Sequence, residues 1–187
     1  QVINSDMELI EGMKAIFDYA DSIGLPVSVN CSAGNELGPH DNTSIISRMI
    51  NALTGPGKIF VVSAGNLCGE HQQYSFKTVG DTSYISLQEV TDKDYELDLW
   101  SGKAGGTFSV AIKLYDSRQM KYTDSSLYFS ASADTTYVKN FVVDGKIYCY
   151  AFVPQLSPFD SKRNVRISCA NLDNDSCFME LFVTSPD

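Results

Sequence analysis

Lys58-Ile-Phe-Val-Val-Ser-Ala-Gly-Asn66 is the segment around which we interpret this chain. Its apolar, β-branched run predicts a buried strand that closes in a turn of small residues. Residues 59–62 are apolar on both faces, which is typical of a central parallel strand covered by helices on each side. Asn66 is then expected at the carboxyl end of the strand, where open α/β sheets bind their ligands.

A helix and a strand are predicted before this segment. The capping-box pattern runs from Ser5 to Glu8, and Gly24 and Pro26 mark the end of the helix. Its buried face is predicted from four apolar residues at helical spacing, with Ile16 beside them: Ile10, Met13, Phe17 and Ala20. Residues 25–31 follow with the Val content of a strand.

A second helix is predicted between the two strands, with Asp41, Asn42 or Thr43 as its cap. The right-handed crossover rule makes the two strands parallel neighbours. We therefore expect an α/β fold with part of a doubly wound parallel sheet. Ser32-Ala33-Gly34 and Ala64-Gly65-Asn66 are expected to leave that sheet side by side at one edge.

The second part of the chain has no convincing helical period. Eight runs read as strands: 84–90, 95–100, 108–115, 127–133, 137–143, 147–153, 165–170 and 178–184. Such even spacing favours an antiparallel sandwich of jelly-roll type. We therefore expect two domains, an α/β part over residues 1–75 and an all-β domain over residues 76–187.

The amino-acid composition limits the classes of molecule that the protein is expected to bind. The 187 residues contain 14 Lys and Arg against 23 Asp and Glu, a net charge of −9. This balance argues against nucleic acid or an anionic membrane as the partner. No apolar run approaches the roughly 20 residues of a membrane span. Because the chain begins with Gln1, we expect a processed piece or an expressed fragment.

Five cysteines are present, and none has CxxC spacing. They are Cys31, Cys68, Cys149, Cys169 and Cys177. The spacing supports no metal site, and an odd number leaves one cysteine outside any disulfide framework. We expect structural thiols, with Cys169–Cys177 as the pair whose spacing suits a hairpin disulfide.

Four motifs in the first part of the chain resemble one known family. Val29-Asn-Cys-Ser-Ala-Gly34 and Val62-Ser-Ala-Gly-Asn66 are similar to the Asn-x-Ser-Leu-Gly strand and the Ala-Ala-Gly-Asn turn of subtilisin-like serine peptidases, the subtilases. Gly38-Pro-His-Asp-Asn-Thr-Ser44 and Leu53-Thr-Gly-Pro-Gly57 resemble motifs of a bacterial subset of that family. In this subset a β-sandwich is inserted before the catalytic Ser, and residues 76–187 resemble that insertion.

The resemblance implies a serine endopeptidase that cleaves peptide or protein substrates through an acyl-enzyme, with no cofactor. Asn66 would supply the side-chain amide of the oxyanion hole, which stabilises the charge of the tetrahedral intermediate. Ser32, Ala33 and Gly34 would line the substrate groove and pair with an extended peptide. Ala64 and Gly65 would form the other wall. Family habit implies an extracellular or envelope-associated protein, while the odd cysteine count leaves the cytoplasm open.

The chain also departs from the family pattern in several motifs. The Asp motif, the His-Gly-Thr-His motif and the Gly-Thr-Ser-x-Ala motif of a subtilase are all absent from this chain. His40 and His71 stand at the wrong places for the catalytic His. Ala33 replaces the usual Leu, and Leu67-Cys68 replaces the usual Glu-Gly. The chain alone is therefore not expected to perform triad catalysis.

Three alternatives stay open at this point. The altered motifs also suit a non-catalytic subtilase-like protein that binds a partner. The β-rich half could be a carbohydrate-binding module, although Trp100 fits a sandwich core better than a sugar platform. The alternating acidic residues Asp92, Asp94, Glu96 and Asp98 could hold a structural calcium ion or mark a solvated strand edge.

Overall fold

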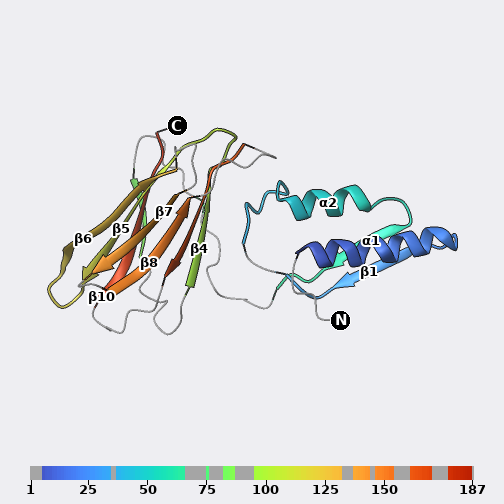
Figure 1. Cartoon of the computed structure of the whole chain (residues 1–187), viewed down its shortest axis with the longest axis horizontal. Helices are drawn as coiled ribbons and strands as arrows, with labels where there is room; N and C mark the ends of the chain where they lie inside the picture. Colours follow the sequence, from blue (N-terminus) through green and yellow to red (C-terminus); the bar gives the residue numbers. More distant parts are fainter. Residues whose placement is uncertain are drawn as a thin grey trace. The chain divides into compact units, whose positions relative to one another are not determined.

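The computed structural model describes residues 6–34, 37–65, 75, 82–86, 95–131, 137–143, 146–153, 161–169 and 177–186. Backbone contacts divide the chain into two compact units, Gln1–Gln73 and Tyr74–Asp187. The first contains helix α1 (Asp6–Ser22), strand β1 (Val27–Cys31), helix α2 (Ile45–Leu53) and strand β2 (Lys58–Val62) (Figure 1). Neither helix combines the length and apolar character needed to cross a bilayer.

Both helices of the first unit cover the same face of a two-stranded sheet. β1 and β2 are parallel, with Val29 opposite Phe60. These residues join one apolar cluster with both helices, whose members are Ile10, Met13, Phe17, Val27, Val29, Ile46, Met49, Ile50, Leu53 and Phe60. On the alternate positions of β2, Ile59 and Val61 are 56% and 46% exposed.

The predicted doubly wound parallel sheet is therefore wrong. That fold requires helices on both faces of an open parallel sheet. Here the described parallel pairing is limited to β1 and β2, one face of this pair is exposed, and most strands of the chain are antiparallel. Apolar residues at successive β2 positions suggested burial on both faces, but only the Phe60 side meets the helices.

The second unit consists of antiparallel strands. They are β3 (Thr82–Ser86), β4 (Tyr95–Trp100), β5 (Ser109–Asp116), β6 (Lys121–Ser130), β7 (Tyr137–Val143), β8 (Lys146–Val153), β9 (Asn164–Cys169) and β10 (Cys177–Thr184). One sheet has the order β3-β10-β5-β6 and the other β4-β9-β8-β7 (Figure 1). A strand overlaps each of the eight predicted ranges.

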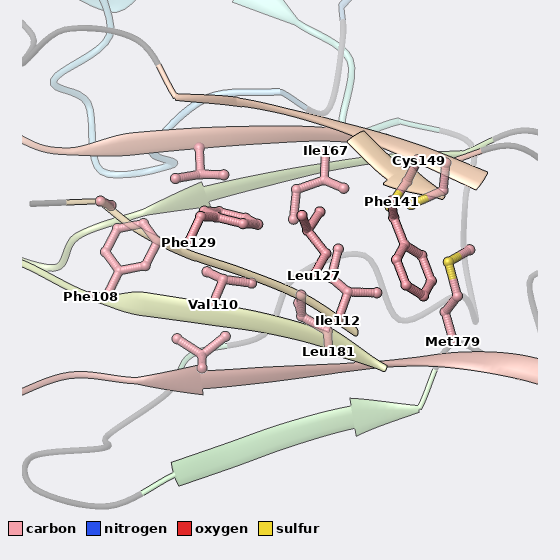
Figure 2. Close-up of a cluster of buried hydrophobic side chains, with 14 of the residues drawn as sticks. Phe108, Val110, Ile112, Leu127, Phe129, Phe141, Cys149, Ile167, Met179 and Leu181 are labelled. Carbon is pink, nitrogen blue, oxygen red and sulfur yellow. The ribbon is translucent and has the colours of Figure 1, made fainter. Parts of the chain in front are cut away.

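The two sheets enclose one apolar core, shown in Figure 2. Val110, Ile112, Val165 and Ile167 are completely buried within it. Along β5, β9 and β10 the residues that belong to this core occupy alternate positions, as a strand with one face against the core requires. The unit is thus built from two sheets packed face to face.

The strand order is not that of a jelly roll. In a jelly roll the chain passes from one sheet to the other at nearly every connection. Here β5 pairs with β6, β7 with β8, and β8 with β9, each within its own sheet. The turn at residues 117–120 explains the first pairing, because the Asp116 carboxylate accepts hydrogen bonds from the amides of Arg118 and Gln119 at 2.9 and 3.1 Å.

Candidate functional site

The carboxyl ends of β1 and β2 bring two predicted site segments together. Cys31 lies opposite Val62 at the end of the paired register, and the Ser63 amide donates to the Cys31 carbonyl at 3.2 Å. Ser32-Ala33-Gly34 and Ser63-Ala64-Gly65 therefore leave the same sheet edge from adjacent strands, which lie about 4.8 Å apart in a sheet. Asn66 follows directly and lies outside the described residues.

Two turns on the opposite side of this pair set its register. Gly24, at φ +69°, ends α1 with its amide donating to Asp21 and the Leu25 amide donating to the Ala20 carbonyl, both at 3.1 Å. This is a Schellman pattern, and it confirms Gly24 as the residue at which the sequence predicts the end of the helix. Before β2, Gly55 and Lys58 exchange backbone hydrogen bonds of 2.9 and 3.1 Å across Pro56-Gly57.

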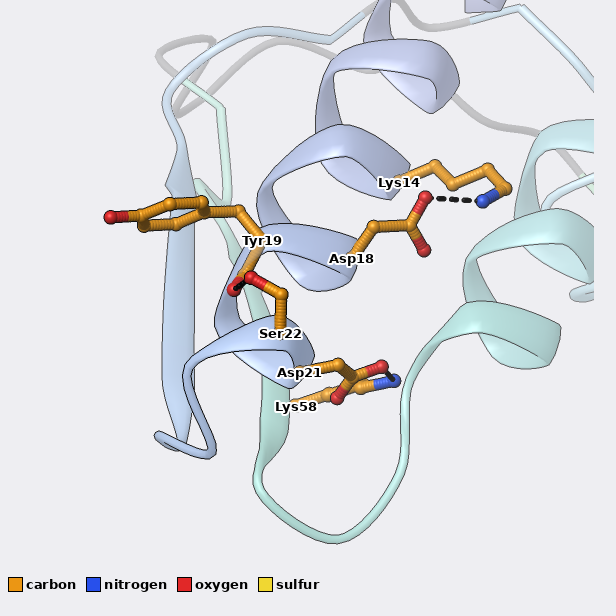
Figure 3. Close-up of polar contacts among 6 residues, drawn as sticks. All are labelled: Lys14, Asp18, Tyr19, Asp21, Ser22 and Lys58. Atoms are coloured by element: carbon orange, nitrogen blue, oxygen red, sulfur yellow. Dashed lines mark hydrogen bonds and ion pairs between the residues drawn. The ribbon is translucent and has the colours of Figure 1, made fainter.

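Charged contacts join α1 to the start of β2. Lys58 pairs with Asp21 at 2.5 Å, and Lys14 pairs with Asp18 one turn earlier on the helix (Figure 3). The Ser22 hydroxyl donates to the Tyr19 carbonyl at 2.7 Å. The amide of Val27 also donates to the Gly57 carbonyl at 2.8 Å, which anchors the start of β1 on the turn before β2.

The predicted groove segments are exposed and have room above them. Ser32, Ala33, Gly34, Ala64 and Gly65 are all exposed. A Cβ atom placed on Gly34 or Gly65 would meet no protein atom within 4 Å. Gly65 has φ +92°, a backbone conformation that favours glycine. The backbone of these segments is therefore open to solvent, and their role in substrate binding stays a prediction.

The loop before α2 is stabilised by its own polar side chains. The Asp41 carboxylate accepts from the Thr43 amide at 3.0 Å and from the Thr43 hydroxyl. The cap of α2 is Ser44, whose hydroxyl accepts from the Ser47 amide at 3.2 Å. The predicted caps at 41–43 are thus wrong. His40 is exposed with φ +51° in this loop, and His71 lies outside the described residues.

Of the acidic stretch, Asp92 and Asp94 lie outside the described residues, while Glu96 and Asp98 lie on β4. Asp98 is a buried carboxylate. The Asp98 side chain is 6% exposed, and its carboxylate accepts from the Trp100 indole at 2.8 Å and from the side-chain amide of Asn164 at 2.5 Å. The solvated-edge interpretation is therefore wrong for Asp98. Trp100 alternates with the core-facing Leu99 and does not join the core, contrary to the prediction. Within the described residues, no three His, Cys, Asp or Glu side chains form a group that could hold a metal ion.

Sequence reasoning missed a continuous run of aromatic rings on the outer face of the β3-β10-β5-β6 sheet. Neighbouring ring centroids are 5.2 to 6.1 Å apart in the order Tyr84, Phe182, Tyr122, Tyr115 and Phe178. We call these five residues the aromatic row. Tyr84 is 65% exposed and Tyr122 is 42% exposed.

Two charged groups lie within the aromatic row. The Lys113 ammonium is 5.4 Å from the centroid of the Tyr122 ring and 5.1 Å from that of Phe182. The Tyr122 hydroxyl donates to the carboxylate of Glu180, a residue that is only 8% exposed. This hydrogen bond, with burial and the Glu180 charge, raises the pKa of Tyr122 to about 12.

The four cysteines that the structure describes are not in disulfides. Cys31, Cys149 and Cys169 are buried, and Cys177 is half-buried. Cys169 and Cys177, the pair whose spacing suited a hairpin disulfide, are not bonded to each other, and β9 and β10 form no hairpin because they belong to different sheets. Cys68 lies outside the described residues.

Comparison with known proteins relates the chain to a solved structure. No protein-family model matches the chain, and no curated protein matches it. Among solved structures, the CspB protease of Clostridium perfringens is similar, with a TM-score of 0.58 and 20% sequence identity over 98% of this chain. The chain spans 38% of the length of that protein. At this identity the likeness shows a shared fold, and it relates the chain to part of a protease structure.

Proposed function

We propose that this chain is part of a subtilisin-like serine endopeptidase, to which it contributes the oxyanion Asn and the substrate groove. One observation supports this proposal above the others: two exposed small-residue segments leave adjacent parallel strands at one sheet edge. Those segments are the ones that resemble the subtilase groove strand and Asn turn. The fold shared with part of a protease is consistent with it.

In this proposal Asn66 donates its side-chain amide to the oxyanion that forms when a serine attacks the scissile carbonyl. Ser32, Ala33 and Gly34 bind the substrate backbone as an added strand. Ala64 and Gly65 form the facing wall, where glycine leaves space for the substrate. The catalytic Ser, His and Asp would come from parts of the longer protein outside these residues.

The first test is labelling of the longer protein with a serine-directed phosphonate, followed by mass spectrometry of the modified peptide. A label on a serine beyond residue 187, lost when the protein is denatured first, supports the peptidase. No label under conditions that modify a control peptidase favours the non-catalytic binding protein instead. We propose an extracellular or envelope location for the intact enzyme, which fractionation of the source cells would test.

A second test addresses Asn66 alone. Asn66→Ala in the longer protein should lower kcat by about 10²–10³, the effect that removing the oxyanion Asn has in subtilisin itself, and leave KM nearly unchanged. Asn140→Ala is the matched control, because Asn140 is an exposed residue of β7. An unchanged kcat for Asn66→Ala would refute the assigned role.

A second candidate function is carbohydrate binding by the β unit, and the aromatic row favours it. Exposed aromatic rings can stack on the apolar faces of sugar rings, and the Tyr hydroxyls can bond to sugar hydroxyls. A glycan array with residues 1–187 tests this candidate. Tyr84→Ala should abolish any binding, whereas Tyr19→Ala, at a 67% exposed position on α1, should preserve it.

A further inference from the structure

Two thiols face each other across the middle of the β4-β9-β8-β7 sheet. Cys149 of β8 and Cys169 of β9 are register partners in an antiparallel pair. They are 0% and 2% exposed, and both belong to the core of the sandwich. Figure 2 shows Cys149 beside Phe141, and Phe141 is its register partner on β7. The two sulfur atoms therefore lie on the same, inner face of the sheet.

The spacing of this pair suits a covalent bond. Directly opposite residues in an antiparallel pair have Cα atoms about 4.5 or 5.5 Å apart. Both values fall within the roughly 4.4–6.8 Å that a disulfide spans. The two thiols are already in hydrogen-bond contact, and this contact together with burial raises the pKa of Cys149. A raised thiol pKa makes the thiolate rare and slows thiol–disulfide exchange in the folded state.

We propose that Cys149 and Cys169 are a redox pair, which a small-molecule disulfide such as oxidised glutathione converts into a cross-strand disulfide between β8 and β9. One cysteine loses its proton, and its thiolate attacks the oxidant, releasing one small thiol. The second thiolate attacks the resulting mixed disulfide and releases the other. Two electrons pass from the protein to the oxidant, and the oxidant takes up both protons.

The position of the pair determines when it reacts. β9 and β8 are the two central strands of their sheet, so neither cysteine borders an open edge. The oxidant can reach the pair when the ladder opens or before it has formed. We therefore expect oxidation to be slow in buffer, at least about tenfold faster in mild urea, and complete when the protein refolds with the oxidant present.

The neighbouring cysteine is an internal control. Cys177 is half-buried and packs against the same core, but it belongs to β10 of the opposite sheet. If exposure decided which cysteine is oxidised, the more accessible Cys177 would react first. If strand register decides it, Cys149 and Cys169 form the disulfide and Cys177 stays a thiol.

The test is refolding of the complete chain in graded mixtures of reduced and oxidised glutathione, followed by acid quenching, alkylation in denaturant and peptide mass spectrometry. The expected product is a Cys149–Cys169 linked peptide, which a reducing agent splits into its two halves. Cys177→Ser should not change its yield. Alkylation of both cysteines at every ratio, stable glutathione adducts, or a link to Cys177 would each overturn the proposal.

The thermal midpoint supplies a second readout. A bond that closes a loop of about 20 residues restricts the unfolded chain, and we expect the oxidised form to melt about 5–10 °C higher than the reduced form. Cys169→Ser removes this difference. If Cys169→Ser does not fold, Cys149→Ala serves, since it places a small apolar group in the core. Identical melting of the oxidised and reduced wild-type protein would contradict a bond across β8 and β9.

Discussion

Ile112 offers a direct measure of how much the core of the β unit contributes to stability. It is completely buried on β5, a central strand, between Leu181 of β10 and Leu127 of β6 (Figure 2). Paired strands on both sides restrict the collapse of a cavity at this site. Ile112→Ala should therefore lower the free energy of unfolding by about 3–5 kcal/mol, the upper part of the usual range for such a truncation.

A second, smaller truncation of Ile112 and an exposed control test whether the loss of stability follows the amount of buried side chain removed. Ile112→Val removes one methylene group and should cost about 0.5–1.5 kcal/mol. Val138→Ala is the matched control, because Val138 is 59% exposed on β7. Losing a largely exposed side chain should cost well under half as much as the Ile112→Ala truncation.

The assay uses the single tryptophan of the chain. Trp100 lies on β4, so its fluorescence during urea unfolding follows the β unit. With a slope of about 1–3 kcal/mol/M, the urea midpoint of Ile112→Ala should fall by roughly 1–5 M while the slope stays constant. A loss below about 1 kcal/mol, or an equal loss for Val138→Ala, would refute the burial argument.

Three further substitutions test local features. Because the hydrogen bond to Glu180 raises the pKa of Tyr122 from 10.0 to about 12, the folded state holds this proton more tightly, and the resulting stability is present below pH 10 and lost as the pH rises toward 12. The difference in urea midpoint between wild type and Tyr122→Phe should shrink across that interval, and a constant difference would contradict the contact. Gly57→Ala should lower the free energy of unfolding by about 1 kcal/mol, because Gly57 has φ +78°, a conformation that strains other residues. Steric contact is not the cause, since the new Cβ would lie 3.8 Å from Pro26. Gly12→Ala, in the exposed middle of α1, should instead raise the free energy of unfolding by roughly 0.5–1 kcal/mol. Unfolding of both glycine variants is followed by far-ultraviolet circular dichroism. Equal changes in stability for the two variants would exclude backbone conformation as the cause.

The sequence predicted the features that local physics determines. The four residues at helical spacing in α1 are all buried, whereas Ile16 beside them is 45% exposed: Ile10, Met13, Phe17 and Ala20. Gly24 takes the left-handed conformation that ends this helix. The parallel pairing of β1 and β2 also follows, because a short helical crossover leaves few other arrangements.

The sequence could not show which surfaces find a partner. Ile59 and Val61 have the apolar character of buried residues, yet each is about half exposed. An apolar side chain shows that a strand position can be buried. Whether that position is buried depends on the elements that pack against the strand. The same limit applies to strand order: even spacing suggested a jelly roll, whereas the turn centred on the Asp116 carboxylate pairs β5 with β6.

The aromatic row was missed for a related reason. Its members lie on β3, β5, β6 and β10, and each looks ordinary within its own strand. The row arises only when register brings Tyr115 opposite both Tyr122 and Phe178, and Phe182 opposite Tyr84. A pattern that runs across strands cannot be seen along one of them.

The candidate site depends on register in the same way. Ser63-Ala64-Gly65 follows Val62, the last residue of β2, so the place of this segment relative to the Ser32 segment follows from the alignment of β2 with β1. A slip of one residue would move the two segments about 3.3 Å and turn Phe60 away from the helices. The contact of Phe60 with both helices, the Gly55–Lys58 turn and the ion pair of Lys58 with Asp21 all oppose that slip. The small apolar core under the sheet therefore sets the geometry of the edge above it.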